Sequence, residues 1–252
     1  YVTAGTVHSV VVVGNYAYVA DWAGLSILNV GNPAAPYGVA SYDTPGEATG
    51  VAVAGNYAYI ADGSQGLYLI NISNPASPTY AGSYNTPGDA YAVAVVGNYA
   101  YVADEYKGLR IINVANPASP SEAGFYDTPG VAYSVAVAGN YAYIADGDAG
   151  LRIINITNPA APTETGSYNP GGYDNGVAVS GDYAYMGCGG TGLKVIRITN
   201  PASPLLTGGR DTPGQAQAVT VAGNYAYVSD QDGGLRIMNI TIALLLVCLV
   251  PL

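Results

Sequence analysis

Hydrophobic and polar positions recur along the chain with a period of about 42 residues. The segment GNYAYVAD, in which tyrosines alternate with small and aliphatic residues, begins at Gly14. Further copies, with small changes, begin at Gly55, Gly97, Gly139, Gly181 and Gly223. The first interval is one residue shorter than the others because of a deletion in the turn after Asp21, which leaves the strands in register. The chain therefore contains six tandem copies of one unit.

The third copy illustrates the four β-strands, a to d, that each unit predicts. Strand a, residues 92–96, is small and β-branched, which suits a crowded inner position. Strand b, residues 99–103, has tyrosines on one face and alanine and valine on the other, so both faces look buried. Strand c, residues 109–114, is almost continuously aliphatic, as in strands covered on both sides. Strand d, residues 122–126, is the most polar and should lie outermost.

The connections between these strands have turn chemistry of their own. Gly-Asn joins strands a and b in nearly every copy, and Asn-Pro-Ala-Ser-Pro or a close variant follows strand c. Proline ends a strand because it offers no amide to the ladder. Thr-Pro-Gly, as at Thr128–Gly130, precedes strand a and predicts a type II turn, in which the glycine has a positive φ.

A period near 42 residues with four strands is typical of a β-propeller blade, which buries its faces only against neighbouring blades. We predict an all-β fold, a six-bladed β-propeller of four-stranded antiparallel blades over residues 1–240, closed as a ring. A propeller of seven or more blades, cut at both ends, is the alternative. The apolar residues 241–252, TIALLLVCLVPL, stand where the last outer strand belongs. We expect them to pair there in an irregular last blade, and we hypothesise that they are a foreign reading frame or a fragment end.

Composition and charge narrow the range of partners. Only seven of the 252 residues are lysine or arginine and the net charge is −10, so no basic patch is available for nucleic acid. The apolar end of the chain is shorter than the roughly 20 residues that cross a bilayer, so we expect no membrane insertion by this segment. Cys188 and Cys248 fit neither a disulfide framework nor a metal-ligand spacing. We expect no cofactor.

The strand c words LRIINV at Leu109 and LRIINI at Leu151, each followed by Asn-Pro-Ala, resemble the LVIVD-repeat family, as does GNYAYVAD. One histidine and one tryptophan exclude WD40 repeats. The resemblance extends to about residue 240 and implies a propeller in an exported or cell-surface protein of bacteria or archaea, mostly without assigned activity. It supplies no catalytic residue, and the fifth copy departs from the pattern at Met186-Gly187-Cys188. We also expect companion domains in the parent protein.

The six copies differ from one another mainly in two sets of turns. In a propeller the a–b and c–d turns share one rim, here called the constant face, and the d–a and b–c turns share the other, here called the variable face. The variable face carries aromatic, amide and carboxylate side chains, which suit a glycan or a protein partner. Its candidate binding residues are His8, Trp22, Glu47, Asp89, Tyr91, Tyr106, Tyr133, Tyr173, Asn175, Gln215 and Gln217.

These features favour a non-enzymatic binding or structural module of an extracellular or cell-surface protein, which contacts a protein or glycan through the variable face. The single histidine, His8, does not provide the nucleophile and base that covalent catalysis needs. Two alternatives remain. One is a hydrolase that uses paired carboxylates on adjacent blades, Glu47 and Asp89. The other is an architectural spacer that binds nothing specific.

An aspartate ends strand b in five copies, and we expect its side chain to cap the turn that follows. These residues are Asp21, Asp62, Asp104, Asp146 and Asp230. Asp146 with Asp148, and Asp230 with Asp232, are weak calcium candidates, because two carboxylates fall short of the six to eight oxygens that calcium takes. We therefore predict no metal site.

A column of cations lies across the hairpin from the aspartates, and we expect cross-strand ion pairs of small energy at the surface. Its members are Arg110, Arg152, Lys194 and Arg236. In the fifth copy Lys194 faces Cys188 instead of an aspartate. We expect Cys188 to be a small buried residue and not a reactive thiol.

Overall fold

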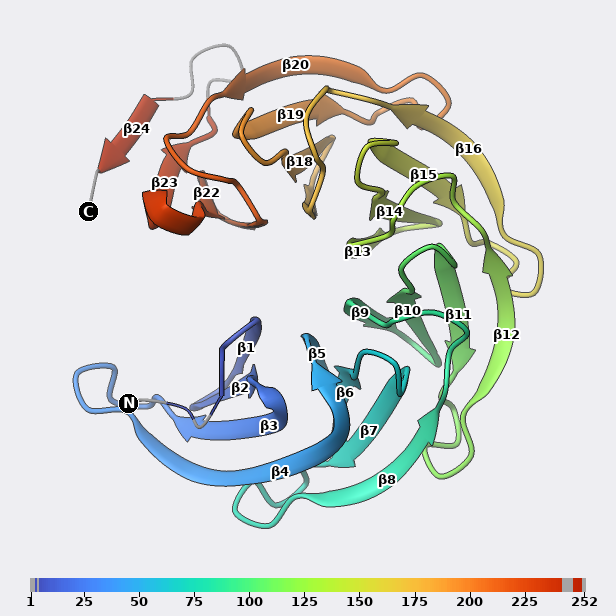
Figure 1. Ribbon diagram of the computed structural model, residues 1–252, viewed down its shortest axis with the longest axis vertical. Helices are drawn as coiled ribbons and strands as arrows, with labels where there is room; N and C mark the ends of the chain where they lie inside the picture. Colours follow the sequence, from blue (N-terminus) through green and yellow to red (C-terminus); the bar gives the residue numbers. More distant parts are fainter. Residues whose placement is uncertain (1–2, 4, 242–246, 251–252) are drawn as a thin grey trace. The chain divides into compact units, whose positions relative to one another are not determined.

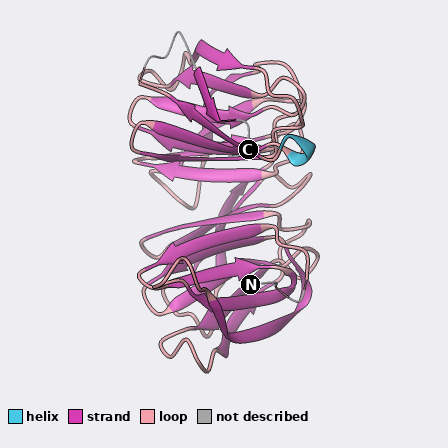
Figure 2. Ribbon diagram, turned by 90° about the vertical axis from the view of Figure 1, so that its left-hand side faces the viewer, coloured by secondary structure: helices cyan, strands magenta, loops and turns pink. Residues whose placement is uncertain are grey.

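The computed structural model describes residues 3, 5–241 and 247–250. Regular structure in these residues is almost entirely β-strand, with one short 3-10 helix, Gln231–Gly233 (Figure 2). The strands form six antiparallel sheets, and in each sheet the strand order follows the sequence order. The fold is a six-bladed β-propeller, which confirms the predicted fold class.

The chain divides into two compact units, Tyr1–Phe125 and Tyr126–Leu252. The first unit holds three sheets (Figure 1). The first sheet contains β1 (Ser9–Val13), β2 (Tyr16–Ala20), β3 (Trp22–Asn29) and β4 (Tyr37–Ala48). The second contains β5 (Gly50–Ala54), β6 (Tyr57–Ala61), β7 (Leu67–Asn71) and β8 (Thr79–Tyr84). The third contains β9 (Ala92–Val96), β10 (Tyr99–Ala103), β11 (Leu109–Asn113) and β12 (Ser121–Tyr126), which ends at the boundary of the unit.

The second unit holds the other three sheets (Figure 1). The fourth sheet contains β13 (Ser134–Ala138), β14 (Tyr141–Ala145), β15 (Leu151–Asn155) and β16 (Thr163–Tyr168). The fifth contains β17 (Gly176–Ser180), β18 (Tyr183–Gly187), β19 (Leu193–Arg197) and β20 (Leu205–Arg210). The sixth repeat supplies three strands, β21 (Ala218–Ala222), β22 (Tyr225–Ser229) and β23 (Leu235–Asn239). From the apolar tail, β24 (Val247–Val250) pairs with β23, as expected of an irregular last blade. The tail residues 242–246 and 251–252 lie outside the described residues.

Burial follows the predicted roles of the four strands. Strands β10 and β11 are buried on both faces, whereas β12 is half exposed and forms the edge of its sheet. The a strands are innermost, since β5 lies beside β1 and β9 in the first unit, and β17 lies beside β13 and β21 in the second. The predicted strand boundaries of the third copy are confirmed to within one residue.

Each core cluster is shared by two successive blades. In the first unit Tyr18 and Ile27 pack with Ile60 of the next blade. In the second unit Tyr143 and Ile153 pack with Met186 of the next blade. Burying one such aliphatic side chain contributes about 1.5–3 kcal/mol. A blade therefore depends on its neighbour for stability.

The a–b hairpins explain the constant Gly-Asn pair. Gly139 has a φ of +57°, and the asparagine after it is not among the described residues with positive φ. This is the pattern of a type II′ turn, which matches the twist of antiparallel strands. A Cβ on Gly139 would meet nothing within 4 Å, so backbone conformation alone selects glycine here.

The Thr-Pro-Gly segments are not the predicted type II turns, because their glycines do not have a positive φ. The reason for glycine is close approach to another backbone. A Cβ on Gly130 would stand 2.1 Å from the carbonyl oxygen of Asp146, and one on Gly46 would stand 2.1 Å from that of Asp62. Any side chain at these positions would force the connection away from the end of strand b.

The shortened first turn changes local structure and leaves the strands in register. Tyr16 pairs with Asn29 in the first blade, as Tyr57 pairs with Asn71 in the second.

The described residues include no helix long and apolar enough to cross a membrane.

Candidate functional site

Four of the strand b aspartates hold the connection that enters their blade. In each, the carboxylate accepts a hydrogen bond from a threonine hydroxyl and another from a glycine amide of the preceding Thr-Pro-Gly segment. We call this arrangement the carboxylate clamp. It joins Asp62 to Thr44 and Gly46, Asp104 to Thr86 and Gly88, Asp146 to Thr128 and Gly130, and Asp230 to Thr212 and Gly214.

The clamp corrects the predicted role of these aspartates. Their side chains bond a segment 16 to 18 residues earlier in the chain and not the turn that follows. The following turn is held by backbone groups instead, since Asp146 N donates to Gly150 O at 2.9 Å. In the first blade, which has no Thr-Pro-Gly segment, the Asp21 carboxylate accepts a hydrogen bond from Ser26 at 2.7 Å.

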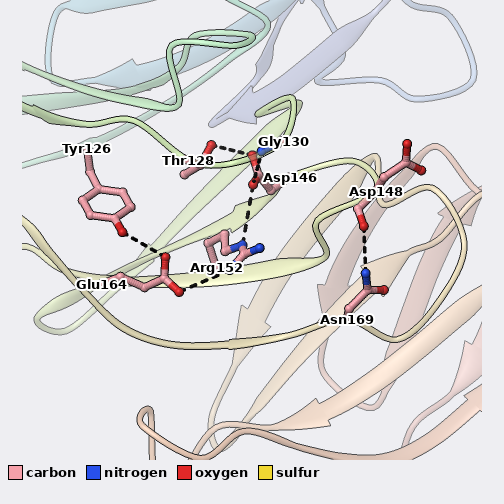
Figure 3. A network of polar contacts seen from close by, with 8 residues as sticks. All are labelled: Tyr126, Thr128, Gly130, Asp146, Asp148, Arg152, Glu164 and Asn169. Carbon is pink, nitrogen blue, oxygen red and sulfur yellow. Dashed lines mark hydrogen bonds and ion pairs between the residues drawn. The ribbon is translucent and has the colours of Figure 1, made fainter.

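The predicted cross-strand ion pairs form, but they are buried and not at the surface. Arg152 Nε lies 3.6 Å from Asp146 Oδ2, and the Asp146 side chain is fully buried (Figure 3). The network extends outward, because Arg152 also pairs with Glu164 at 3.3 Å and Glu164 accepts a hydrogen bond from Tyr126. Equivalent pairs join Arg110 to Asp104 and Arg236 to Asp230.

Burial raises the pKa of Asp146, and the hydrogen bonds from Thr128 and Gly130 and the charge of Arg152 oppose that rise. The same balance raises the pKa of Asp104. Removing one partner from such a buried pair typically costs about 3–5 kcal/mol, because the remaining charge stays buried without compensation. The clamp is therefore a structural element of each blade that carries it.

The two carboxylates of each weak calcium candidate have different surroundings. Asp146 and Asp230 use both carboxylate oxygens within their clamps. Asp148 and Asp232 are exposed, and the backbone carbonyl of Asp148 accepts a hydrogen bond from Asn169 (Figure 3). Within the described ranges, no group of three or more histidine, cysteine, aspartate or glutamate residues is arranged to hold a metal ion.

The fifth blade lacks the clamp. Cys188 stands in the aspartate column, Pro170 replaces the clamp threonine, and Asp174 replaces a buried alanine that four other copies have. Asp174 is fully buried, and neither of its carboxylate oxygens has a hydrogen-bond partner of ordinary geometry in the described part of the chain. Sequence reasoning missed Asp174, although the paired exchange of alanine for aspartate and aspartate for cysteine in one copy was a visible signal.

The burial of Asp174 changes its own pKa and that of the neighbouring Cys188 thiol. Desolvation raises its pKa to about 6, with the Cys188 thiol and Lys194 lowering it and Asp148 raising it further. Burial and the Asp174 charge also raise the pKa of the Cys188 thiol. Cys188 is fully buried, which confirms the prediction of a small buried residue. Lys194 pairs with Asp211 at 3.2 Å, so its main partner is not Cys188.

The variable face is assembled by hydrogen bonds between turns of successive blades. In the first unit Gly63 and Ala90 exchange backbone hydrogen bonds, and in the second Gly147 and Asp174 do the same. Each pair joins a b–c turn to the next d–a connection. The two sets of turns therefore lie side by side within each unit, as the sequence predicted.

The residue after the aspartate column has a left-handed backbone in all six copies. Three copies have glycine there, Gly63, Gly147 and Gly189, whereas the others have Trp22 (φ +70°), Glu105 (φ +51°) and Gln231 (φ +41°). A left-handed backbone costs an ordinary L-residue about 1–2 kcal/mol. A bulky residue in this region is a strong outlier.

In the first unit the variable face brings His8 and Trp22 together. Their ring centroids are 5.0 Å apart, and Trp22 is 43% exposed. Among the large hydrophobic side chains of the described residues, Tyr106 is the most exposed, at 68%.

Glu47 and Asp89, the paired carboxylates of the hydrolase hypothesis, have different surroundings. Glu47 is exposed and lies against Gly63. Asp89 is half-buried and close enough to Asp104 for its charge to raise the pKa of that residue. Tyr91 is also half-buried, and its amide donates to Ala103 O.

In the second unit the variable face joins Tyr133 to Tyr173. Their hydroxyl oxygens are 2.8 Å apart, and their rings are 5.5 Å apart at an angle of 55°. Asn175 donates from its side-chain amide to the Tyr173 carbonyl at 3.1 Å and thereby fixes the backbone under that ring.

Two glutamines were also candidates on this face, and their settings differ. Gln215 is exposed, and its side-chain amide lies against Gly189 and Gly190. Gln217 is half-buried, and its backbone amide donates to Ser229.

Comparisons with known proteins match the whole repeat array. A model of the LVIVD repeat matches residues 4–44, 45–86, 87–128, 129–170, 171–212 and 213–241. A search of curated proteins found no match.

Solved structures share the fold at low sequence identity. A functionally unknown protein from Desulfotomaculum acetoxidans DSM 771 has a TM-score of 0.81 and 13% identity, over 98% of this chain and 86% of that one. A protein from Lactobacillus plantarum has a TM-score of 0.81 and 15% identity, over 96% and 83%. The computationally designed Ika8 protein has a TM-score of 0.71 and 13% identity, over 95% and 72%. At these identities the likeness concerns the fold alone.

Proposed function

The chain belongs to the LVIVD-repeat family, and on that premise we propose that it is a non-enzymatic binding module of an exported or cell-surface protein. It contacts its partner, a glycan or a protein, through the variable face. The constant face consists of turns with nearly the same sequence in every copy, and the buried aspartates of four blades are engaged in the clamps. The variable face is where exposed side chains differ between copies.

The observation that carries this proposal is the backbone of Trp22. Its φ of +70° lies in the left-handed region, where three other copies have glycine. The side chain is nonetheless large, and it remains 43% exposed, so a substantial part of its surface is open to a partner. Strain that persists at an exposed side chain supports a role in contacting something outside the chain.

The test uses glycan and protein arrays with matched variants. Trp22→Gly should raise the free energy of unfolding by about 1 kcal/mol, because glycine adopts the left-handed backbone without strain. A variant that combines Trp22→Gly, Tyr106→Ala and Tyr173→Ala should lose the signals that the wild type gives. Tyr37→Ala is the control, since Tyr37 is 58% exposed on the outer strand β4.

If the combined variant keeps every array signal of the wild type, the proposal is wrong. A wild type that gives no signal on either array would also contradict it, and would favour an architectural spacer. If the wild type hydrolyses an arrayed glycan and Glu47→Gln or Asp89→Asn abolishes that hydrolysis, the hydrolase hypothesis would replace the proposed binding function.

A further inference from the structure

The variable face of the second unit contains two tyrosines in contact with each other, with glycines and a glutamine beside them. Tyr133 and Tyr173 come from different repeats, and their hydroxyl oxygens lie 2.8 Å apart. Tyr173 is 39% exposed. The two rings are tilted by 55°, so they do not stack on each other face to face. An exposed ring face with a fixed position is a surface on which an apolar ligand face can rest.

Glycines lie beneath and beside the two rings. A Cβ on Gly147 would stand 3.4 Å from Tyr133 Cε2 and 3.6 Å from Tyr173 Cζ, so both rings lie close to the backbone of this turn. A Cβ on Gly189 would stand 3.7 Å from Tyr173 Cβ. Since neither glycine has a side chain, the turns beside the rings add no bulk there, and a ligand wider than one ring can lie across them.

Polar groups border the rings on the same face. The Gln215 amide lies against Gly189 and Gly190, where a Cβ would be 3.1 Å from its oxygen and 3.3 Å from its nitrogen, respectively. Asp148 is exposed in the turn that contains Gly147, and Asn169 holds the backbone carbonyl of Asp148 at 2.7 Å. An amide that both donates and accepts hydrogen bonds, beside an aromatic face, can bind a ligand with an apolar side and a hydroxylated edge.

We infer that Tyr133, Tyr173 and Gln215 form a glycan-binding platform, which specifies the partner class of the proposed function and rests on it. A pyranose ring presents axial C–H groups on one face and hydroxyls around its edge. The tyrosine rings take the C–H face, and Gln215 takes a pair of neighbouring hydroxyls. The carboxylate of Asp148 and the net charge of −10 favour a neutral sugar over a sulfated or uronic one.

The experiment is a calorimetric titration of the full chain with four ligands, each tested separately. Three are neutral hexasaccharides, one each of glucose, mannose and N-acetylglucosamine, and the fourth is a heparin hexasaccharide. At least one neutral hexasaccharide should bind, and the heparin fragment should bind more weakly. Tyr173→Ala should weaken binding at least about tenfold, as expected for an aromatic residue at the centre of a small interface. Tyr173→Phe keeps the ring and should weaken it less, and Tyr37→Ala should leave it unchanged.

Several results would overturn this inference. The inference is wrong if no neutral hexasaccharide binds, if Tyr173→Ala binds as well as the wild type, or if the heparin fragment binds more tightly. Thermal unfolding of each variant shows that the fold is intact. A protein-array signal that depends on the variable face, without any hexasaccharide binding, would refute the glycan platform and leave the proposed function standing. If neither a hexasaccharide nor the protein array gives a signal, both the glycan platform and the proposed function are wrong.

Discussion

In the fourth blade the carboxylate at the end of strand b, Asp146, accepts hydrogen bonds from Thr128 and Gly130 and pairs with Arg152. In the fifth blade Cys188 occupies that position, and the buried carboxylate is Asp174, on the incoming connection. The two carboxylates lie at equivalent places in successive blades, where a d–a connection meets the end of a strand b. One is held by three partners, whereas the other has no hydrogen-bond partner of ordinary geometry among the described residues.

This difference separates two uses of a buried charge. At Asp146 the hydrogen bonds and the arginine offset part of the cost of desolvation, so the charge holds the connection in place. At Asp174 desolvation dominates and raises the pKa to about 6. The stability of the fifth blade should therefore depend on pH between about 4 and 6.

Removal of the clamp carboxylate should have the greatest effect. Asp146→Ala leaves the Gly130 amide and the Thr128 hydroxyl without their acceptor and deprives Arg152 of its buried partner. We expect the free energy of unfolding to fall by about 3–5 kcal/mol, measured by denaturant titration. Asp148→Ala, two residues away and exposed, should change it by no more than about 0.5 kcal/mol. Equal losses in the two variants would show that the clamp does not hold the blade.

Asp174 should respond to pH in the opposite sense to an ordinary salt-bridged carboxylate. Its pKa is raised from 3.8 to about 6 in the folded chain, so the folded state binds the proton more tightly than the unfolded state. The contribution of Asp174 to the free energy of unfolding is therefore most favourable below about pH 4, and it falls as the pH rises through about 6. The loss is about 3 kcal/mol at most, because one pKa unit corresponds to about 1.36 kcal/mol.

Asp174→Ala isolates this contribution, because alanine is the residue at this position in four other copies. Unfolding of the wild type and of this variant should be compared between pH 4 and pH 8. The variant should be the more stable protein at pH 8, and the difference should shrink as the pH falls towards 4. A difference that stays constant over this range would mean that Asp174 does not titrate there.

Loss of one donor should have a smaller effect than loss of the carboxylate. Thr128→Val keeps the shape of the side chain and removes its hydroxyl hydrogen bond to Asp146. We expect a loss of about 2 kcal/mol in unfolding free energy, since hydrogen bonds to charged groups contribute about 1.5–3 kcal/mol. Thr128→Ser, which retains the hydroxyl, should recover most of it. A serine variant as unstable as the valine variant would indicate that the methyl group matters and the hydrogen bond does not.

The strands could be predicted from the sequence because the alternation in strand b and the aliphatic run in strand c are local patterns. The clamp could not, because Asp146 and Thr128 are 18 residues apart and meet only when one connection enters the next blade. The glycine of Thr-Pro-Gly was assigned to a turn conformation, whereas its actual constraint is the carbonyl of Asp146. On the variable face the columns were visible, but the contact of Tyr133 with Tyr173 depends on side-chain positions across two repeats.

One experiment separates the residues that hold the fold from those that contact a partner. Unfolding free energy, and affinity for the strongest ligand found on the arrays, are measured together for Thr128→Val and Tyr173→Ala. Thr128→Val should lose about 2 kcal/mol of stability and keep its affinity, whereas Tyr173→Ala should keep its stability and bind at least about tenfold more weakly. The opposite pattern, with stability lost at Tyr173 and affinity lost at Thr128, would contradict this division between the recurring and the variable residues.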